Sequence, residues 1–214
     1  MLRPTPPATT SAAPDARTRI LDAALTLFRE KGYTATTVDD LCRTAGVTKG
    51  AFFHHFESKE AATLAAIGRW NALTGALFEA APYWQVKDPR ARLLAYLDFR
   101  AALVGGELPE FTCLLGTLVQ ETFASHPALQ AACGAGIQEH ARTLVPTIVE
   151  AQARYAPRAD WSAESLARHI QAVLQGGFVL AKAFGEPQAA LEAIGHLRRH
   201  VEALFPVGNR RKAR

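Results

Sequence analysis

The sequence predicts an all-α fold, and three observations support that class. Apolar residues recur at helical spacing in almost every segment, Pro and Gly mark the breaks between segments, and no alternating strand pattern or internal repeat is present. Few positions could turn a β-hairpin. With 214 residues and 49% hydrophobic residues, the chain can bury the cores of one small and one medium domain.

A pair of short helices separated by a tight turn is the clearest local feature. The first should begin at Thr37, whose hydroxyl can form a capping box with Asp40, and should end at Gly46. The second, Lys49–Phe56, should be capped by Thr48. A turn of this length fixes the angle between the helices, which is typical of a helix-turn-helix that reads DNA.

This pair and its flanks resemble the DNA-binding domain of the TetR family of bacterial one-component regulators. The resemblance covers residues 36–59, TTVDDLCRTAGVTKGAFFHHFESK, and residues 17–32, RTRILDAALTLFREKG, whose buried stripe is Ile20, Ala24, Leu27 and Phe28. About 45 residues match in order and spacing, which is far more specific than a short motif. The resemblance implies about nine helices. It also implies a helix-turn-helix domain at residues 15–60 and a larger ligand-binding and dimerisation domain at residues 61–206.

Outside these domains we expect a disordered N-terminal arm at residues 1–14, which holds four prolines, and a basic disordered tail at residues 207–214. Residues 1–60 carry 8 basic and 7 acidic side chains, and residues 61–209 carry 12 and 13. These two stretches cancel, so the four basic residues of the tail account for the net charge of +4. DNA affinity must come from the local placement of basic groups rather than from bulk charge.

The resemblance implies a contact set for a double-stranded DNA operator. Phosphate contacts are implied for Thr36, Thr37, Thr48 and Lys59, and base-edge contacts for Lys49, Gly50 and Phe52. A Thr at a helix start can serve only as a cap, and an exposed Lys can simply be solvated. We favour DNA contact for the set.

The end of the second helix carries one departure from the family. Phe53 falls where the family usually has a Tyr whose hydroxyl binds a phosphate, and a Phe cannot make that bond. The neighbouring His54 and His55 should point about 100° apart, which disfavours a two-ligand metal site. We expect at least one of them to bind phosphate.

After Lys59 the chain should remain helical. Pro and Gly breaks predict helices at Ser58–Ala80, Pro89–Val104, Glu110–Ala124, Pro127–Tyr155 with a bend at Pro146, Ser162–Phe184 and Pro187–Phe205. The last two have apolar stripes that could form an ordinary core. The resemblance instead implies that they pack against a second copy, and we favour a homodimer interface containing Leu166, Ile170, Val173, Gly177, Leu180, Leu191, Ile194 and Val201. A two-fold dimer requires a roughly palindromic operator.

The central helices, from Trp70 to about Phe178, should form the pocket of a small hydrophobic or electrophilic effector. The candidate lining residues are Trp70, Tyr96, Phe99, Cys113, Thr117 and Gln120. Large aromatic residues are more often plain core than pocket lining. Cys113, Thr117 and Gln120 share a semi-polar helix flank, and TCLLGTLVQE resembles the segment in which some family members sense electrophiles or oxidants through a cysteine.

Other function classes have little support in the sequence. The chain has three cysteines without metal-ligand spacing, so neither a metal nor another cofactor is expected. No spacing indicates that Cys113, His126, His140 and His169 converge, and we do not expect an enzyme. No apolar run is long enough for a membrane span and no signal peptide is recognisable, which predicts no membrane partner and a cytoplasmic location.

We therefore expect a repressor that binds a palindromic operator as a homodimer. An effector, or modification of Cys113, would release it. The alternative is a DNA-binding architectural or partner-controlled protein without an effector. A filled core in the second domain would favour that alternative, and an empty cavity would favour the sensor.

Overall fold

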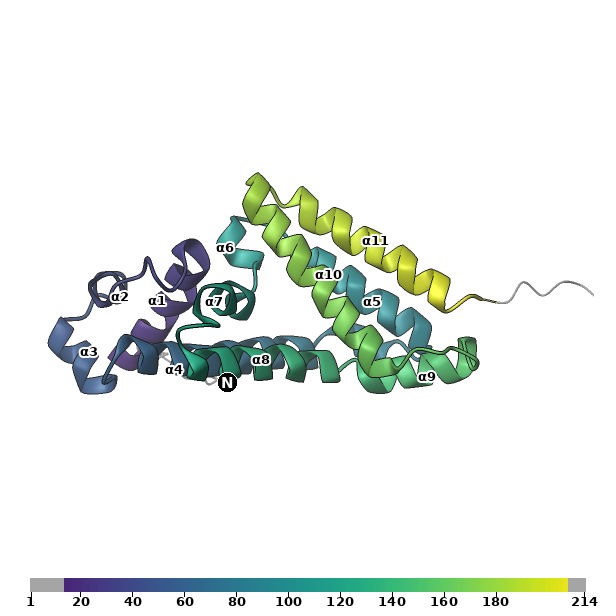
Figure 1. Ribbon diagram of the computed structural model, residues 1–214, viewed down its shortest axis with the longest axis horizontal. Helices are drawn as coiled ribbons and strands as arrows, with labels where there is room; N and C mark the ends of the chain where they lie inside the picture. The colour runs from purple at the N-terminus through teal and green to yellow at the C-terminus, as the bar shows by residue number, and fades with distance from the viewer. Residues whose placement is uncertain (1–13, 208–214) are drawn as a thin grey trace, which may run out of the picture.

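The computed structural model describes residues 14–207. Within this range all regular secondary structure is helical (Figure 1). Their bounds are α1 Ala16–Lys31, α2 Val38–Ala45, α3 Lys49–His55, α4 Lys59–Glu79, η1 Pro82–Gln85, α5 Pro89–Ala102, α6 Leu108–Phe111, α7 Leu114–Thr122, α8 Pro127–Arg142, α9 Val145–Tyr155, α10 Ala163–Phe184 and α11 Gln188–Leu204. The all-α prediction is confirmed. The proposed arm and basic tail fall almost entirely outside the described residues.

The helices are arranged along one long axis (Figure 1). Helices α1, α2 and α3 form a head at one end, and α4 leads from the head along the molecule beside α8. At the other end, α10 and α11 pack over α5 and α9. No helix between residues 14 and 207 has the length and apolarity that a membrane span needs.

The predicted caps set the helices of the head. Thr37 Oγ1 accepts the Asp40 N–H at 3.1 Å and the Asp40 carboxylate accepts the Thr37 N–H at 3.0 Å, which completes the capping box. Gly46 ends α2 with φ of 61°, and Thr48 caps α3 by accepting the Ala51 N–H at 3.1 Å. Local sequence chemistry is therefore sufficient to place the turn between the two helices.

Two of the expected helices are each divided. The segment after residue 107 breaks at Thr112, which is extended with ψ of 155°, so that α6 and α7 are separate and Cys113 stands at the N-cap of α7. The expected helix bent at Pro146 is instead α8 followed by α9. Pro146 lies in the first turn of α9, where a missing N–H costs nothing because no helical partner exists there.

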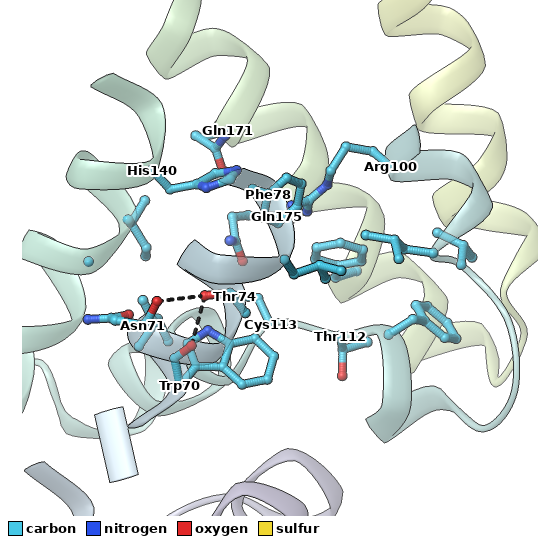
Figure 2. Close-up of a pocket in the computed structure, with 18 of the residues that line it drawn as sticks. Trp70, Asn71, Thr74, Phe78, Arg100, Thr112, Cys113, His140, Gln171 and Gln175 are labelled. Atoms are coloured by element: carbon cyan, nitrogen blue, oxygen red, sulfur yellow. Dashed lines mark hydrogen bonds between the residues drawn. The ribbon is translucent and has the colours of Figure 1, made fainter. Parts of the chain in front are cut away.

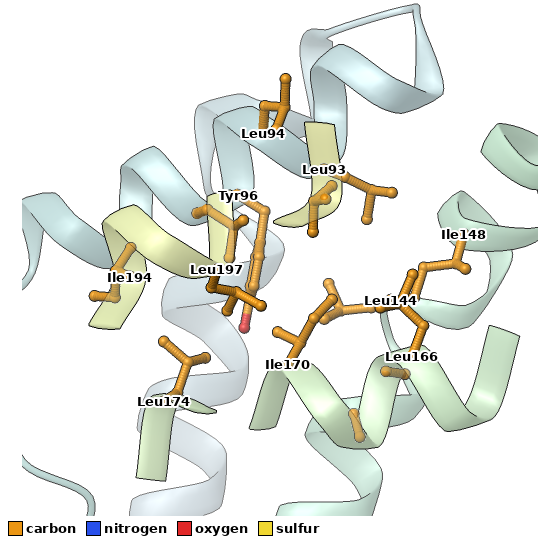
Figure 3. Close-up of a cluster of buried hydrophobic side chains, with 14 of the residues drawn as sticks. Leu93, Leu94, Tyr96, Leu144, Ile148, Leu166, Ile170, Leu174, Ile194 and Leu197 are labelled. Atoms are coloured by element: carbon orange, nitrogen blue, oxygen red, sulfur yellow. The ribbon is translucent and has the colours of Figure 1, made fainter. Parts of the chain in front are cut away.

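Two apolar clusters form the interior. One holds head residues together with residues of α4, α7 and α8, among them Ile20, Phe28, Leu114, Leu118 and Leu129. The other lies at the far end and is centred on Tyr96, Leu144, Ile148, Ile170 and Leu197 (Figure 3). The head thus shares its core with the larger domain, and α4 is not its sole connection.

The stripe predicted for the dimer is largely internal. Leu166, Ile170, Ile194 and Val201 are at most 4% exposed and pack within the protomer. A Cβ at Gly177 would lie 3.1 Å from Ala193 Cβ, so this glycine allows α10 and α11 of the same chain to approach. These five residues are corrected to intramolecular core. Leu180 is 45% exposed, and Val173 and Leu191 are half-buried.

Candidate nucleic-acid interface and effector pocket

Helix α3 presents a different face from the one expected. Phe52 is fully buried in the head core and stacks against Phe56, with ring centroids 5.7 Å apart. Its neighbour Phe53 is 50% exposed, and Lys49 and Gly50 are also exposed. The predicted base contact by Phe52 is therefore corrected, because a helix turns by about 100° per residue and only one of two adjacent Phe side chains can face outward.

Lys49 is free to exchange partners. Its ammonium lies 2.9 Å from the Asp39 carboxylate, and both side chains are more than half exposed. Surface ion pairs of this kind contribute little stability. A DNA phosphate or base edge could replace Asp39 at small cost. Lys49 accordingly keeps its predicted place on the outer face of the head.

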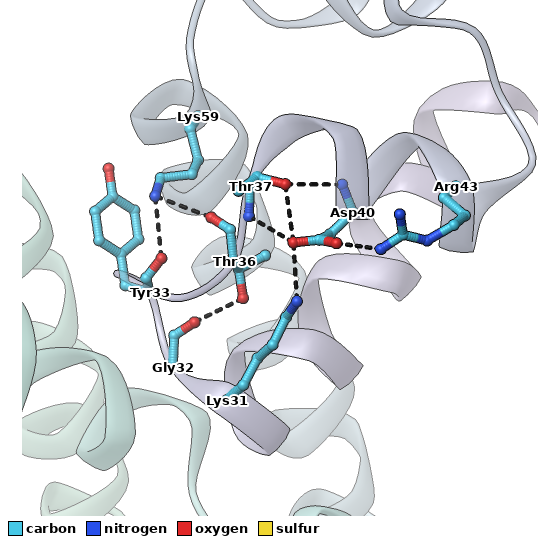
Figure 4. Close-up of polar contacts among 8 residues, drawn as sticks. All are labelled: Lys31, Gly32, Tyr33, Thr36, Thr37, Asp40, Arg43 and Lys59. Carbon is cyan, nitrogen blue, oxygen red and sulfur yellow. Dashed lines mark hydrogen bonds and ion pairs between the residues drawn. The ribbon is translucent and has the colours of Figure 1, made fainter.

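Two other predicted phosphate contacts point inward (Figure 4). The Thr36 hydroxyl is fully buried and donates to Gly32 O at 2.7 Å. Lys59 Nζ donates to Tyr33 O and Thr36 O, each at 3.0 Å, and lies 4.0 Å from the Tyr33 ring centroid. Burial lowers the pKa of the Lys59 ammonium. Both side chains hold the loop between α1 and α2. The assignment of the fully buried Thr36 to DNA is corrected, and that of the half-buried Lys59 stays a prediction.

The remaining threonines, Thr37 and Thr48, differ in whether the hydroxyl can still donate to a DNA phosphate. Thr37 Oγ1 accepts from Asp40 N and donates to the Asp40 carboxylate at 2.8 Å, so its hydroxyl is occupied (Figure 4). Asp40 also accepts from Lys31 and Arg43. The hydrogen bond from Lys31, followed by those from the Thr37 backbone and side chain, holds the pKa of Asp40 well below the usual range. Thr48 accepts one bond as a cap and is exposed, so its hydroxyl proton remains available.

His54 and His55 follow at the end of α3. Their rings lie 5.1 Å apart at 69°, with His54 exposed and His55 half-buried. Within residues 14–207 no group of three or more His, Cys, Asp or Glu side chains is placed to hold a metal ion. The exposed face of α3 and its cap consists of Thr48, Lys49, Gly50, Phe53 and His54.

A cavity of about 180 Å³ lies between α4, α5, α8 and α10, closed on one side by the residues from α6 to α7 (Figure 2). Its walls are mainly apolar and include Trp70, Phe78, Phe111 and Phe178. A second cavity of about 280 Å³ adjoins it and shares Cys113. The interior of this domain is therefore not completely filled.

The predicted pocket residues divide into three groups. Trp70 and Cys113 line the first cavity, and Thr117 and Gln120 line the second. Tyr96 is 1% exposed and belongs to the core behind His140, while Phe99 packs edge-on against Phe78 with centroids 5.6 Å apart. Tyr96 and Phe99 line neither cavity, so both are corrected to core residues.

Sequence reasoning missed most of the polar lining. Arg100, Thr112, His140, Gln171 and Gln175 come from three different helices and one break, and they meet only in three dimensions (Figure 2). No spacing along the chain signals such a convergence.

His140 is the titrating group with the clearest perturbation in the pocket. Its Nε2 lies 3.1 Å from the Tyr96 hydroxyl, whose own neighbour is Gln171. Burial, aided by the charge of Arg100, lowers the pKa of His140 from 6.5 to about 4. The imidazole is therefore neutral at pH 7.

The pocket and the head meet at a polar junction. The Glu121 carboxylate of α7 accepts the N–H groups of Tyr33 and Thr34 at 3.2 and 2.9 Å. Lys182 of α10 donates to Arg29 O at 3.2 Å and to Thr117 Oγ1 at 2.7 Å. Three contacts therefore link the lining of the second cavity to the end of α1 and the loop before α2.

Gly32 is required at this junction for two reasons. Its φ of 81° lies in the region that favours glycine, and a Cβ there would fall 1.8 Å from Glu121 Oε1. The sequence suggested only that Gly32 stops the first helix. The close approach of Glu121 depends on the packing of α7 beside α1.

Comparison with known proteins gives consistent matches along the chain. Residues 20–66 match the family model described as "Bacterial regulatory proteins, tetR family", and residues 89–197 match "Tetracyclin repressor-like, C-terminal domain". The transcriptional regulator AcuR of Cereibacter sphaeroides is 31% identical over 175 residues, which are 79% of each chain. The repressor KstR2 of Rhodococcus jostii is 48% identical over 59 residues, and this match spans only 28% of the chain and 29% of KstR2.

Solved structures share the fold over most of their length. A TetR regulatory protein from Rhodobacter sphaeroides superposes with a TM-score of 0.74 at 26% identity, covering 89% of this chain and 99% of that one. A mutant of the regulator CifR, in a structure that includes a complex with 26 bp operator DNA, gives a TM-score of 0.72 at 21% identity and covers 87% and 97%.

The two adjacent Phe residues of α3 should respond differently to truncation. We expect Phe52→Ala to lower the free energy of unfolding by about 3–5 kcal/mol, because it empties a fully buried site. Phe53→Ala, on the exposed face, should change it by less than about 1 kcal/mol. Urea unfolding of both variants measures the difference, and equal losses would contradict the burial assignment.

His140 should make the stability of the protein depend on pH. Between about pH 6.5 and 4 the unfolded chain binds a proton at His140 that the folded protein does not, so stability falls as the pH falls through this window. His140→Gln should remove a loss on the order of 2 kcal/mol. Urea unfolding at a series of pH values tests this, and parallel profiles for wild type and variant would refute it.

Proposed function

Because the chain belongs to the tetR family of bacterial regulatory proteins, we propose that this DNA-binding regulator is a ligand-responsive repressor. Its relatives are transcriptional regulators and not enzymes. The observation that carries the ligand response is the pair of cavities that adjoin the polar junction with the head. A partner-controlled factor without an effector would have no use for this space.

The outer face of α3 supplies the DNA contacts in this proposal. Lys49 and Gly50 approach the base edges, and the Phe53 ring packs against a thymine methyl group or a sugar. Thr48 and His54 donate to phosphates. Because Phe53 has no hydroxyl, its contact with DNA is apolar. The family pattern has a polar contact between a Tyr hydroxyl and a phosphate at this position.

The operator is palindromic because two copies bind it as a homodimer. The exposed side of α10, next to the buried stripe, carries Ala172, Gly176 and Leu180, with Val173 partly exposed beside them. Small and apolar residues on one helix face allow close packing against a second copy. Two heads related by a two-fold axis then address half-sites about one helical turn apart, roughly 34 to 36 Å.

Release follows from movement of α7. An effector in the cavities displaces the residues between α6 and α7, and Glu121 at the far end of α7 carries that displacement to the loop before α2. Lys182 transmits a shift of α10 to the end of α1 in the same way. A preference of about 1–3 kcal/mol for the non-binding arrangement is enough to change operator occupancy usefully.

Cys113 provides a second trigger in the proposal. It is half-buried between the two cavities, whereas Cys42 and Cys133 are buried, and burial raises the pKa of Cys133 to about 12. Burial lowers the pKa of Arg29 and of Lys182, and the nearby Cys113 sulfur is among the groups that oppose this shift. Alkylation of this thiol would place a bulky group where an effector is proposed to bind.

Sequencing the DNA fragments that the purified protein selects tests the regulator proposal. We expect inverted repeats with half-site centres about one helical turn apart. In gel shifts on a selected fragment, Lys49→Ala and Phe53→Ala should each weaken binding roughly tenfold, a loss typical of one base-edge contact. Lys87→Ala, an exposed lysine outside the head, is the control. Unrepeated single sites, or unchanged affinity of both head variants, would count against the proposal.

The thiol trigger has its own test. N-ethylmaleimide should release the selected operator from the wild-type protein and should fail to release it from Cys113→Ser, because the other two thiols are buried. Mass spectrometry should find one modified cysteine in the wild type. Release that persists in Cys113→Ser rejects the thiol trigger and leaves the non-covalent effector standing.

A further inference from the structure

Arg100 is a charged group without a counter-ion among the described residues. Its guanidinium forms no hydrogen bond or ion pair with another side chain of residues 14–207. It stands between two aromatic rings, 5.2 Å from the Phe78 centroid and 5.6 Å from that of Phe178, and it lines the first cavity (Figure 2). Arg100 is half-buried, so its guanidinium has lost part of its water shell, and the two rings compensate only in part for an absent anion.

The nearest acidic group in the lining does not fill this role. Glu110 lies on the same cavity, but its carboxylate accepts the Glu107 N–H at 3.0 Å in a capping box. Burial lowers the pKa of Arg29, and the negative charge of Glu110 opposes this shift. No salt bridge joins Glu110 to Arg100 within the described chain. The positive charge of Arg100 is therefore left for a ligand.

A second observation points to a ligand at the same place. The Thr112 hydroxyl is the buried side-chain polar atom of residues 14–207 that has no hydrogen-bond partner, and the residue is 1% exposed. It lines both cavities. A buried hydroxyl without a partner costs about 1–3 kcal/mol, so a ligand oxygen toward which the Thr112 side chain rotates would recover this loss.

We infer that the first cavity binds the carboxylate of a compact apolar acid, with Arg100 as its ion partner. This inference deepens the proposed function by naming the chemical class of the effector. The guanidinium donates to the carboxylate in a forked arrangement, and the apolar body lies against Trp70, Phe111 and Phe178. Thr112 and Gln175 supply neutral donors. His140, which faces the same space, adds no second cation at pH 7.

The lining favours a carboxylate over a phosphate ester. A phosphate monoester carries close to two negative charges at pH 7, whereas Arg100 is the only unpaired cation that lines this cavity in the described structure. A volume of about 180 Å³ is also below the usual range for drug-sized ligands, so the body must be small.

Calorimetric titration of the full-length protein with two matched pairs tests the inference. The pairs are benzoate with benzamide and hexanoate with hexanamide, which keep the apolar body and change the charge. In at least one pair we expect the carboxylate to bind roughly tenfold to a hundredfold more tightly than its amide. If neither carboxylate binds better than its amide, the inference is overturned. Phenyl phosphate binding more tightly than benzoate would reject the carboxylate assignment.

Variants locate the effect. Arg100→Gln should remove the preference for the carboxylate while leaving amide binding unchanged, and Arg100→Lys should keep part of the preference. Arg142→Gln, an exposed arginine at the end of α8, is the matched control and should bind as the wild type does. Urea unfolding checks that each variant folds. If Arg100→Gln folds and retains the preference for the carboxylate, the site has been assigned wrongly. If Arg100→Gln does not fold, the comparison of carboxylate and amide binding to the wild-type protein decides whether the inference holds.

This experiment separates the ligand class from the regulator proposal. Calorimetry is done without DNA, so a carboxylate preference can be found or refuted whether or not an operator is bound. Gel shifts on the selected operator, with and without the tighter-binding acid, then report release. A carboxylate that binds through Arg100 without releasing operator would refute the sensor function and leave the site intact.

Discussion

The apolar core of the head is shared with the rest of the protein. Ile20 and Phe28 of α1 are buried together with Leu114 and Leu118 of α7 and Leu129 of α8. Side chains in such a core are packed as closely as in an organic crystal, so α7 and α8 cannot move far without disturbing the head. The orientation of α3, and of every residue that could meet DNA, depends on this shared packing.

Polar contacts tie the loop between α1 and α2 to two helices, α4 and α7, that take part in this shared core. Lys59 closes the loop between α1 and α2 from inside the head, and Glu121 holds the backbone of the same loop from α7. Side chains from two different helices, α4 and α7, satisfy the N–H and C=O groups of this loop. The position of the loop therefore depends on how these two helices are placed relative to each other. The loop is therefore the natural place for the occupancy of the cavities to affect the DNA-reading face.

The pocket combines apolar walls with polar groups that are not fully paired. The buried Thr112 hydroxyl lacks a hydrogen-bond partner and the half-buried Arg100 lacks an ion partner, while His140 and Tyr96 are satisfied by one another. Leaving such groups unpaired costs stability in the empty protein. The cost is recovered by a ligand of matching chemistry, so the same deficit that weakens the apo protein gives the pocket its selectivity.

Local chemistry made much of the fold predictable. Thr37 with Asp40, Gly46 and Thr48 place the helices of the head through hydrogen bonds within a few residues, and these interactions need no tertiary information. The break at Thr112 was missed because the helical periodicity continues through it. At Thr112 the chain changes direction so that both α6 and α7 can pack. The periodicity of apolar residues does not reveal such a change.

The sequence by itself determined the fold class, the family and the position of the turn that reads DNA, because each rests on spacing within one segment. Tertiary structure decided which side chains are available. Phe52 and Thr36 are buried, Lys59 faces the loop, and Ile194 lies inside the protomer, although each has the spacing of a functional residue. It also decided the pocket, since Arg100, Thr112 and His140 are far apart in the chain and converge only when the helices pack.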